Sequence, residues 1–300
     1  MRTQARRAVS QSWALLFAVL CAGGTIAAAQ TEKIQLRLVP LPDQWVQFHM
    51  VQEIATSRTE RAREGMVPEF TVKLVATFTQ TTGHSDADGR VRAELTYDEL
   101  SATTTTAGKT TPVEMPSSLL GQQMIATYDA QGKLVDIQAA PGMPANVVAR
   151  LREMMTSVFS GLGSNSFSVG ETVSTPINMT LPASTNTGPS LTGTMAMTLR
   201  SISEEGGERL AHFDQKMQLS MESTRQLPVS GSRSESTTMT MGMKMVGTGT
   251  MDYNVNRGFM VANRMQSTID TKSSFDTPSP NGMPNFDMHM IVKLSIDATY

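Results

Sequence analysis

Strict alternation of apolar and polar residues recurs along most of the chain, and it limits what the chain can fold into. Successive side chains of a β-strand point to opposite faces, so a period of two predicts strands with one apolar and one polar face. Such strands form antiparallel sheets that are wetted on one side. The rows of alternate, largely apolar residues run from Val72 to Phe78, Val91 to Tyr97, Val173 to Leu181, Ala211 to Met221, Met239 to Met245 and Met288 to Ile296. We therefore expect a mainly β protein with antiparallel sheets.

Turn residues separate these rows. Gly89, Gly132, Gly207 and Gly258 each follow polar residues at a point where a tight turn with positive φ is expected. Longer stretches rich in Ser, Thr, Pro and Gly predict surface loops. These stretches are residues 101–118, 182–193, 222–238 and 271–285.

One segment departs from the period of two. Its apolar residues recur every three or four positions, which predicts an amphipathic helix over residues 144–162 of about 28 Å. Pro144 suits its first turn, and Gly161 or Gly163 its end. The apolar stripe has to be buried, so we expect an α+β arrangement in which this helix packs on a curved sheet or half-barrel.

The mature chain is expected to form a single β-rich domain over residues 30–300. Gly89-Arg90-Val91 and Gly207-Glu208-Arg209 each begin an alternating strand after a turn, and a tyrosine-turn-strand block follows each of them. This order predicts two similar halves, residues 31–165 and 166–300. Chance resemblance between alternating strands is the alternative interpretation.

The first 29 residues have the pattern of a cleavable signal peptide. Arg2, Arg6 and Arg7 precede the apolar run of residues 13–20, and small residues end at Ala29. We expect export, cleavage near Ala29, and a periplasmic or extracellular location. Lipoprotein processing at Cys21 and twin-arginine export fit less well, because Leu20 precedes the cysteine and the residues after Arg7 match the twin-arginine pattern poorly.

Charge and cysteine content narrow the classes of partner. The signal segment holds three arginines and no acidic residue, so its removal takes the formal net charge from −2 to −5. This mild acidity argues against a nucleic-acid partner. Cys21 is the single cysteine, so the mature chain has no disulfide. No later segment is apolar enough to predict a transmembrane span.

Several blocks together resemble an uncharacterised family of secreted bacterial β-rich proteins, known as a domain of unknown function. The resembling blocks are GQQMIATYDAQGKLVDIQ from Gly121, FSVGETV from Phe167 and GTGTMDYNVNRGFMVANRMQ from Gly247, together with the strands before Thr96-Tyr97 and the predicted helix. The sequence departs from the family at Glu171-Thr172-Val173, where an aromatic residue is usual. The resemblance implies an envelope or secreted location, no known activity and no functional residue to carry over.

Methionine is abundant, with 23 residues, and its alternate placement predicts apolar strand faces. Unbranched methionines pack in cores and also line adaptable ligand pockets. A pocket between the predicted helix and the sheet would be lined by Leu151, Met154, Met155, Val158, Phe159, Met239, Met241, Met243, Met245, Met288 and Met290. Plain core packing is the main alternative, and a Cu(I) site on the methionine rows is a further one. Lipoprotein carriers of the bacterial envelope combine a half-barrel with helices in a similar way.

No catalytic motif, metal-ligand spacing or cofactor-binding motif stands out in the sequence. His49, His84, His212 and His289 have no metal-ligand spacing, and we expect His212 and His289, which lie in alternating strands, to be partly exposed structural histidines. We therefore expect a non-enzymatic exported protein, without a cofactor, that binds an apolar small molecule or lipid in the cell envelope. The alternative is a structural or interaction module that contacts another envelope protein. A copper protein and an enzyme are the two remaining alternatives.

Overall fold

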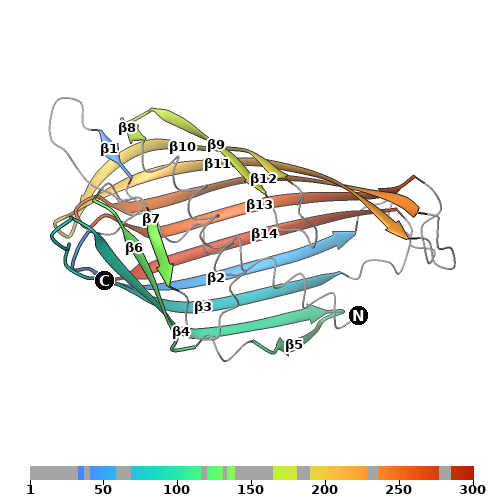
Figure 1. Ribbon diagram of the computed structural model, residues 1–300, viewed down its shortest axis with the longest axis horizontal. Helices are drawn as coiled ribbons and strands as arrows, with labels where there is room; N and C mark the ends of the chain where they lie inside the picture. The colour runs from blue at the N-terminus through green and yellow to red at the C-terminus, as the bar shows by residue number, and fades with distance from the viewer. Residues whose placement is uncertain are drawn as a thin grey trace.

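The computed structural model describes residues 33–36, 41–58, 69–115, 120–130, 134–138, 165–180, 190–228, 236–276 and 285–300 (Figure 1). The strands are β1 (Ile34–Gln35), β2 (Trp45–Arg58), β3 (Phe70–Thr82), β4 (Val91–Thr106), β5 (Lys109–Val113), β6 (Gln123–Tyr128), β7 (Leu134–Gln138), β8 (Ser166–Phe167), β9 (Thr172–Thr180), β10 (Ser190–Glu205), β11 (Glu208–Pro228), β12 (Ser236–Asn254), β13 (Phe259–Phe275) and β14 (Phe286–Thr299). Within these ranges no residue is helical. The predicted helix over residues 144–162 lies outside them.

Twelve strands form one antiparallel sheet, which confirms the predicted fold class at this level. The strand order is β7-β6-β4-β3-β2-β14-β13-β12-β11-β10-β9, and β5 pairs with β4 away from this path. The sheet is open, with β7 and β9 at the two ends of the order. β1 and β8 form a separate antiparallel pair. Figure 1 shows the long strands running side by side, with β6 and β7 turning across one end.

Two consecutive meanders meet in the middle of this sheet. One runs from β2 through β4 to β7, and the other runs from β9 to β14. They are joined by an antiparallel pairing of β14 with β2, in which Ile296 lies opposite Met50. The last strand of the chain is therefore a central strand of the sheet.

Alternation divides the sheet into two faces as predicted. On β3, Val72, Leu74, Ala76 and Phe78 are buried, whereas Lys73 between them is exposed. On β12, Met245 is buried, whereas Val246 on the opposite face is 50% exposed. We call the face that carries the buried apolar residues the inner face, and the other the outer face.

The predicted loops are shorter than expected, because the strands continue into the polar stretches. Residues 101–106, 109–113, 190–193, 222–228, 236–238 and 271–275 all belong to strands. The prediction of loops over these residues was wrong. Threonine is β-branched and fits a half-buried pleated surface, so a threonine-rich stretch continues a strand when a neighbouring strand pairs with it. Thr103 to Thr106 of β4, for example, pair with both β3 and β5.

The predicted turns agree with the structure better than the predicted loops do. Gly89, Gly207 and Gly258 have φ angles of 75°, 84° and 77°, a region that L-residues rarely adopt. In the turn before Gly89, the Asp86 carboxylate accepts hydrogen bonds from the backbone N–H groups of Asp88 and Arg90. This confirms a hairpin turn at this point.

A first apolar cluster is formed by two layers. Ile34 and Leu36 from the β1 region and Phe167 from β8 are almost fully buried against the inner face of the large sheet. The Phe167 ring meets that of Phe213 on β11 edge to face, with centroids 5.2 Å apart. The β1–β8 pair therefore covers one part of the inner face.

A second apolar cluster is formed by strands β9 to β14 alone. Its buried members are Ile177, Leu191, Leu219, Met221, Met245 and Ile269, and its partly buried members are Met195, Met217, Met241, Met243, Met290 and Val292. We call these twelve residues the methionine floor. All of them come from neighbouring strands of one sheet, so no second described layer contributes to the methionine floor.

Glycines mark places where adjacent strands approach closely. A Cβ atom at Gly249 on β12 would collide with the carbonyl oxygen of Arg264 on β13, and one at Gly193 on β10 would collide with that of Gln218 on β11. The missing side chains therefore permit a local backbone geometry that alanine could not adopt. Gly249 sits beside the boundary between the two apolar clusters.

Proline residues protect two exposed strands. Pro176 lies within β9, at one end of the sheet, and Pro112 lies within β5, which pairs with β4 alone among the described strands. Proline has no N–H to offer an incoming strand, so its presence discourages edge-to-edge association.

The two meanders share one local feature that bears on the predicted halves. The β6–β7 register shifts beside Tyr128, and the β12–β13 register shifts beside Tyr253. Both tyrosines are almost fully buried. The duplication of residues 31–165 and 166–300 stays a prediction, and these matching irregularities agree with it.

Candidate functional site

The candidate site is the methionine floor on the inner face of β9 to β14. Four of the methionines named from the sequence, Met241, Met243, Met245 and Met290, belong to it. Met239 and Met288 are partly buried at the ends of the same two strands, opposite Phe275 and Thr271 respectively. The predicted helix residues Leu151, Met154, Met155, Val158 and Phe159 lie outside the described residues.

Strand register sets the arrangement of this floor. One cross-strand row places Leu219, Met245, Ile269 and Met290 side by side on four strands. The next row places Leu191, Met221 and Met243 side by side. The floor is thus continuous across the sheet, and its buried members Met221 and Met245 are each 8% exposed.

Sequence reasoning had not assigned Met195, Met217, Met221 and Ile269 to the site. The signal that could have found them was the same alternation, because Met217 and Met221 lie in one of the predicted rows. What was missing was the register, which places β11 between β10 and β12 and so brings Met195 beside Met217 and Met221 beside Met243.

The cross-strand pairs also bear on the copper alternative. Two direct methionine pairs occur in the floor, Met221 with Met243 and Met195 with Met217. Alternate residues of one strand lie about 7 Å apart, so a third sulfur would have to come from another strand. The neighbour of Met243 on its other side is Thr271, which is not a soft ligand. Among the described residues there is no group of three His, Cys, Asp or Glu side chains that could hold a metal ion.

Polar side chains are buried next to the floor. Gln215 on β11 is 2% exposed and Asn263 on β13 is 1% exposed. The side-chain oxygens Gln215 Oε1 and Asn263 Oδ1, and the hydroxyl oxygen Ser273 Oγ, have no hydrogen-bond partner in the described part of the chain. Gln215 lies two residues before Met217, so the polar group adjoins the floor directly.

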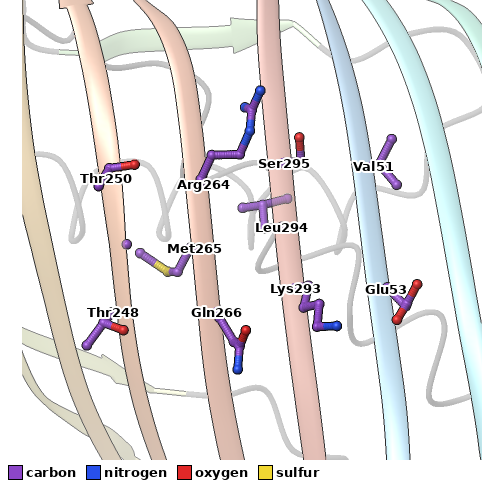
Figure 2. Close-up of a pocket in the computed structure, with 11 residues that line it drawn as sticks. Val51, Glu53, Thr248, Thr250, Arg264, Met265, Gln266, Lys293, Leu294 and Ser295 are labelled. Atoms are coloured by element: carbon purple, nitrogen blue, oxygen red, sulfur yellow. The ribbon is translucent and has the colours of Figure 1, made fainter.

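A shallow trough of about 540 Å³ crosses the outer face of the same sheet. Figure 2 shows its two walls, each a row of side chains across four strands. Thr250, Arg264, Ser295 and Val51 form one row, and Thr248, Gln266, Lys293 and Glu53 form the other. The Arg264 guanidinium is held by the carbonyl oxygen of Ile296, at 2.7 Å, and by the carboxylate of Asp297. This trough is wide and open, and the guanidinium of Arg264 is already engaged.

A hydrogen-bonded chain of four polar residues lies on the outer face of β10 to β12. His212 Nδ1 is 2.7 Å from Asp252 Oδ1, and His212 Nε2 is 2.8 Å from Ser203 Oγ. These are the contacts of a Ser-His-Asp triad. Ser203 Oγ also donates to Glu205 Oε1 at 3.0 Å. A hydroxyl has one proton, so Ser203 cannot donate to Glu205 and to His212 Nε2 at the same time.

The other histidines also bond to polar side chains of the surface. His84 Nδ1 lies 2.6 Å from Asp43 Oδ2, and His289 Nδ1 lies 2.7 Å from Asp270 Oδ1. His49 Nδ1 lies 3.3 Å from Thr77 Oγ1. This agrees with the prediction of partly exposed structural histidines for His212 and His289.

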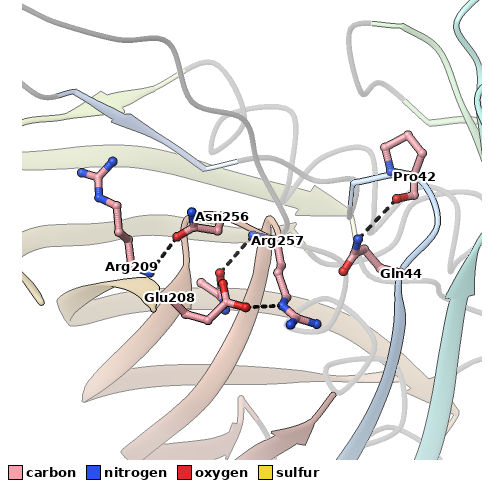
Figure 3. Close-up of polar contacts among 7 residues, drawn as sticks. Pro42, Gln44, Glu208, Arg209, Asn256 and Arg257 are labelled. Carbon is pink, nitrogen blue, oxygen red and sulfur yellow. Dashed lines mark hydrogen bonds and ion pairs between the residues drawn. The ribbon is translucent and has the colours of Figure 1, made fainter. Parts of the chain in front are cut away.

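Polar contacts connect the β12–β13 turn to neighbouring segments at one end of the sheet (Figure 3). Arg257 Nε donates to Glu208 Oε1 at 2.7 Å, and Asn256 Oδ1 accepts from the backbone N–H of Arg209 at 2.7 Å. The Arg257 guanidinium carbon also lies 4.9 Å from the centroid of the Tyr300 ring. The backbone N–H of Leu41 donates to the Arg257 carbonyl, so the segment before β2 is tied to this turn.

One surface carboxylate has a clearly altered affinity for its proton. The backbone N–H of Ser168 donates to Glu171 Oε2 at 2.9 Å, and this hydrogen bond lowers the pKa of the Glu171 carboxyl. The Ser168 hydroxyl lowers it further. Glu171 is exposed and lies on the turn before β9.

Comparisons with known proteins give no assignment. No protein-family model matches the sequence, and no curated protein matches it. No helix in the described ranges is long and apolar enough to cross a membrane. The function therefore has to be inferred from the site itself.

Proposed function

We propose that this protein is an exported, non-enzymatic binding protein that holds the apolar chain of a lipid, or a ligand of similar chemistry, on the methionine floor. The observation that carries the proposal is the single-layer floor. Six of its twelve apolar residues are only partly buried, although the floor runs without interruption across six strands.

The physical argument rests on the cost of exposed apolar surface. A sheet normally buries its apolar face against a second layer. The β1–β8 pair does this for the first cluster, and no described strand does it for the methionine floor. Removing apolar surface from water is favourable by about 25 cal/mol per Å², so an apolar chain laid on the floor would be stabilised.

Methionine suits such a surface better than branched residues do. Its unbranched side chain and polarisable sulfur repack around ligands of different shape. The signal-peptide pattern of residues 1–29 supports binding in the periplasm or outside the cell.

The test is the mass of the protein after gentle purification from the exported fraction. Native mass spectrometry should show bound lipid, released by organic solvent, on the wild-type protein. A clean apo mass, together with no binding of a fluorescent acyl probe, would contradict the proposal and would favour a structural module.

A matched pair of variants on β12 tests which face of the sheet binds the ligand. Met243→Glu puts a carboxylate onto the floor and should abolish binding of the acyl probe, because an unpaired charge among apolar groups is costly. Val246→Glu adds the same charge on the outer face, at a residue 50% exposed, and should leave binding unchanged. If Met243→Glu fails to fold, Met243→Gln provides a neutral replacement of similar size.

A further inference from the structure

The methionine floor ends at two buried amide side chains. Gln215 on β11 lies directly opposite Gly249 on β12, and Gly249 lies directly opposite Met265 on β13. Asn263 lies two residues from Met265, on the same inner face. Gln215 and Asn263 therefore lie two strands apart and two residues apart along the strands, about 12 Å from each other.

The side-chain oxygens of both amides have no hydrogen-bond partner among the described residues, although each residue is at most 2% exposed. Buried polar groups in native proteins are nearly always hydrogen-bonded, and an unsatisfied buried acceptor lowers the stability of the fold. Apolar residues of similar size would avoid this cost. The two oxygens are therefore suited to a partner that supplies hydrogen-bond donors.

Two glycines of β12 lie at the level of these amides, and β13 packs closely against them, because a Cβ atom at Gly247 would collide with the Ser267 side chain and one at Gly249 with the Arg264 carbonyl oxygen. Gly247 and Gly249 are the inner-face residues of β12 next to Met245, so no β12 side chain separates Gln215 from β13 at this level. On β12, the row of inner-face methionines therefore gives way to two glycines near the buried amides of Gln215 and Asn263. An apolar chain on the methionines would bring its polar end to this place.

The uncharged surroundings of the two amides limit which head groups the ligand can carry. The row through Gln215 consists of Val173, Met197, Gln215, Gly249, Met265, Leu294 and Gln52, and the row through Asn263 consists of Leu199, Phe213, Met251, Asn263, Ile296 and Met50. None of these side chains is charged. A carboxylate or an ammonium group would be desolvated here without a counter-charge, which is strongly unfavourable.

We infer that the ligand is a neutral amphiphile whose head group carries hydroxyl or amide N–H donors, such as a monoacylglycerol. Its acyl chain lies on the methionine floor, and its head group donates hydrogen bonds to Gln215 Oε1 and Asn263 Oδ1. This inference rests on the proposed function, because it names the class of ligand for the same site.

Three probes with one acyl chain test it. Monocaprin has donors, methyl caprate is neutral without a donor, and caprate is an anion. Binding to the purified mature protein is measured by titration calorimetry, each probe below its critical micelle concentration. Monocaprin should bind about tenfold more tightly than methyl caprate, as expected for one satisfied buried acceptor, and caprate should bind most weakly.

Two variants of β11 complete the design. Gln215→Leu removes one of the two acceptors and should clearly reduce the preference for monocaprin over methyl caprate, while leaving the protein at least as stable. Gln218→Leu, at an exposed residue on the outer face of the same strand, should retain the preference.

The two possible failures are distinguishable. If none of the three probes binds, the proposed function itself fails. If they bind with equal affinity, or if Gln215→Leu keeps the full preference, the head-group inference is overturned while lipid binding stands.

Discussion

His212 and Asp252 lie directly opposite each other on β11 and β12, and His212 Nδ1 approaches Asp252 Oδ1 to 2.7 Å. Polar side chains that bond directly across two strands contribute to the stability of a sheet surface. The His212 side chain is 20% exposed, whereas that of His289, in the equivalent pair with Asp270, is 30% exposed. Asp252 is also less exposed than Asp270, at 37% against 57%. Burial should make the first pair the stronger one.

A double-mutant cycle measures this difference. Combining His212→Gln with Asp252→Asn should give a coupling free energy of about 0.5–1 kcal/mol in urea denaturation. The cycle for His289 and Asp270 should give a smaller value, because solvent screens exposed pairs more strongly. Equal coupling in both pairs would show that burial does not control their strength.

Gly249→Ala should destabilise the protein by about 1–3 kcal/mol, because the added methyl group collides with the Arg264 carbonyl and the backbone has to shift. Gly242→Ala, on the same strand, is the control. An added Cβ at Gly242 meets no atom within 4 Å, so the free energy of unfolding of this variant should lie within about 0.5 kcal/mol of the wild-type value. Denaturant unfolding of both proteins is the measurement, and similar losses would contradict the close approach at Gly249.

The two apolar clusters should respond differently to cavity formation. Leu199→Ala, at a fully buried residue of the two-layer cluster, should cost about 2–5 kcal/mol. Leu219→Ala makes the same change in the methionine floor and should cost clearly less, since a single layer can relax into the vacated space. Equal losses of unfolding free energy would mean that the floor is packed as tightly as the first cluster.

Glu171 should titrate below the ordinary range of glutamate. The hydrogen bond from the Ser168 backbone N–H favours the carboxylate and lowers its pKa. Because the pKa is lower in the folded state, the stabilisation is fully present above the pKa of the unfolded chain. It is lost as the pH falls through the folded-state pKa. NMR titration should show the shift, and Ser168→Ala should keep most of it because the backbone donor remains. A normal Glu171 midpoint in the wild type would contradict this hydrogen bond.

Local periodicity predicted the strands and their faces well. The alternation at Val72 to Phe78 and at Met239 to Met245 correctly indicated which side chains turn inward, because side-chain direction in a strand depends only on the period of two. It also identified four of the methionines of the floor. The helix over residues 144–162 and the five pocket residues on it stay predictions.

Strand order and strand ends could not be read in the same way. The pairing of β14 with β2 joins residues more than 200 positions apart, and no local pattern encodes it. Threonine-rich strand ends, such as residues 103–106 of β4, were wrongly predicted as loops because their composition is polar. The lack of a hydrogen-bond partner for Gln215 Oε1 could not be predicted from the sequence either, because only the fold shows whether a buried oxygen has a partner. In the sequence this residue interrupts an apolar row, and that interruption was the available signal.

The position of β14 has a consequence for how the protein folds. Because β14 pairs with β13 on one side and with β2 on the other, the two meanders become one sheet only when the β14–β2 pairing has formed. This pairing joins residues far apart in the sequence, and such non-local pairing is slow to form. We therefore expect each meander to assemble first and the β14–β2 seam to close in a slow, late step of folding.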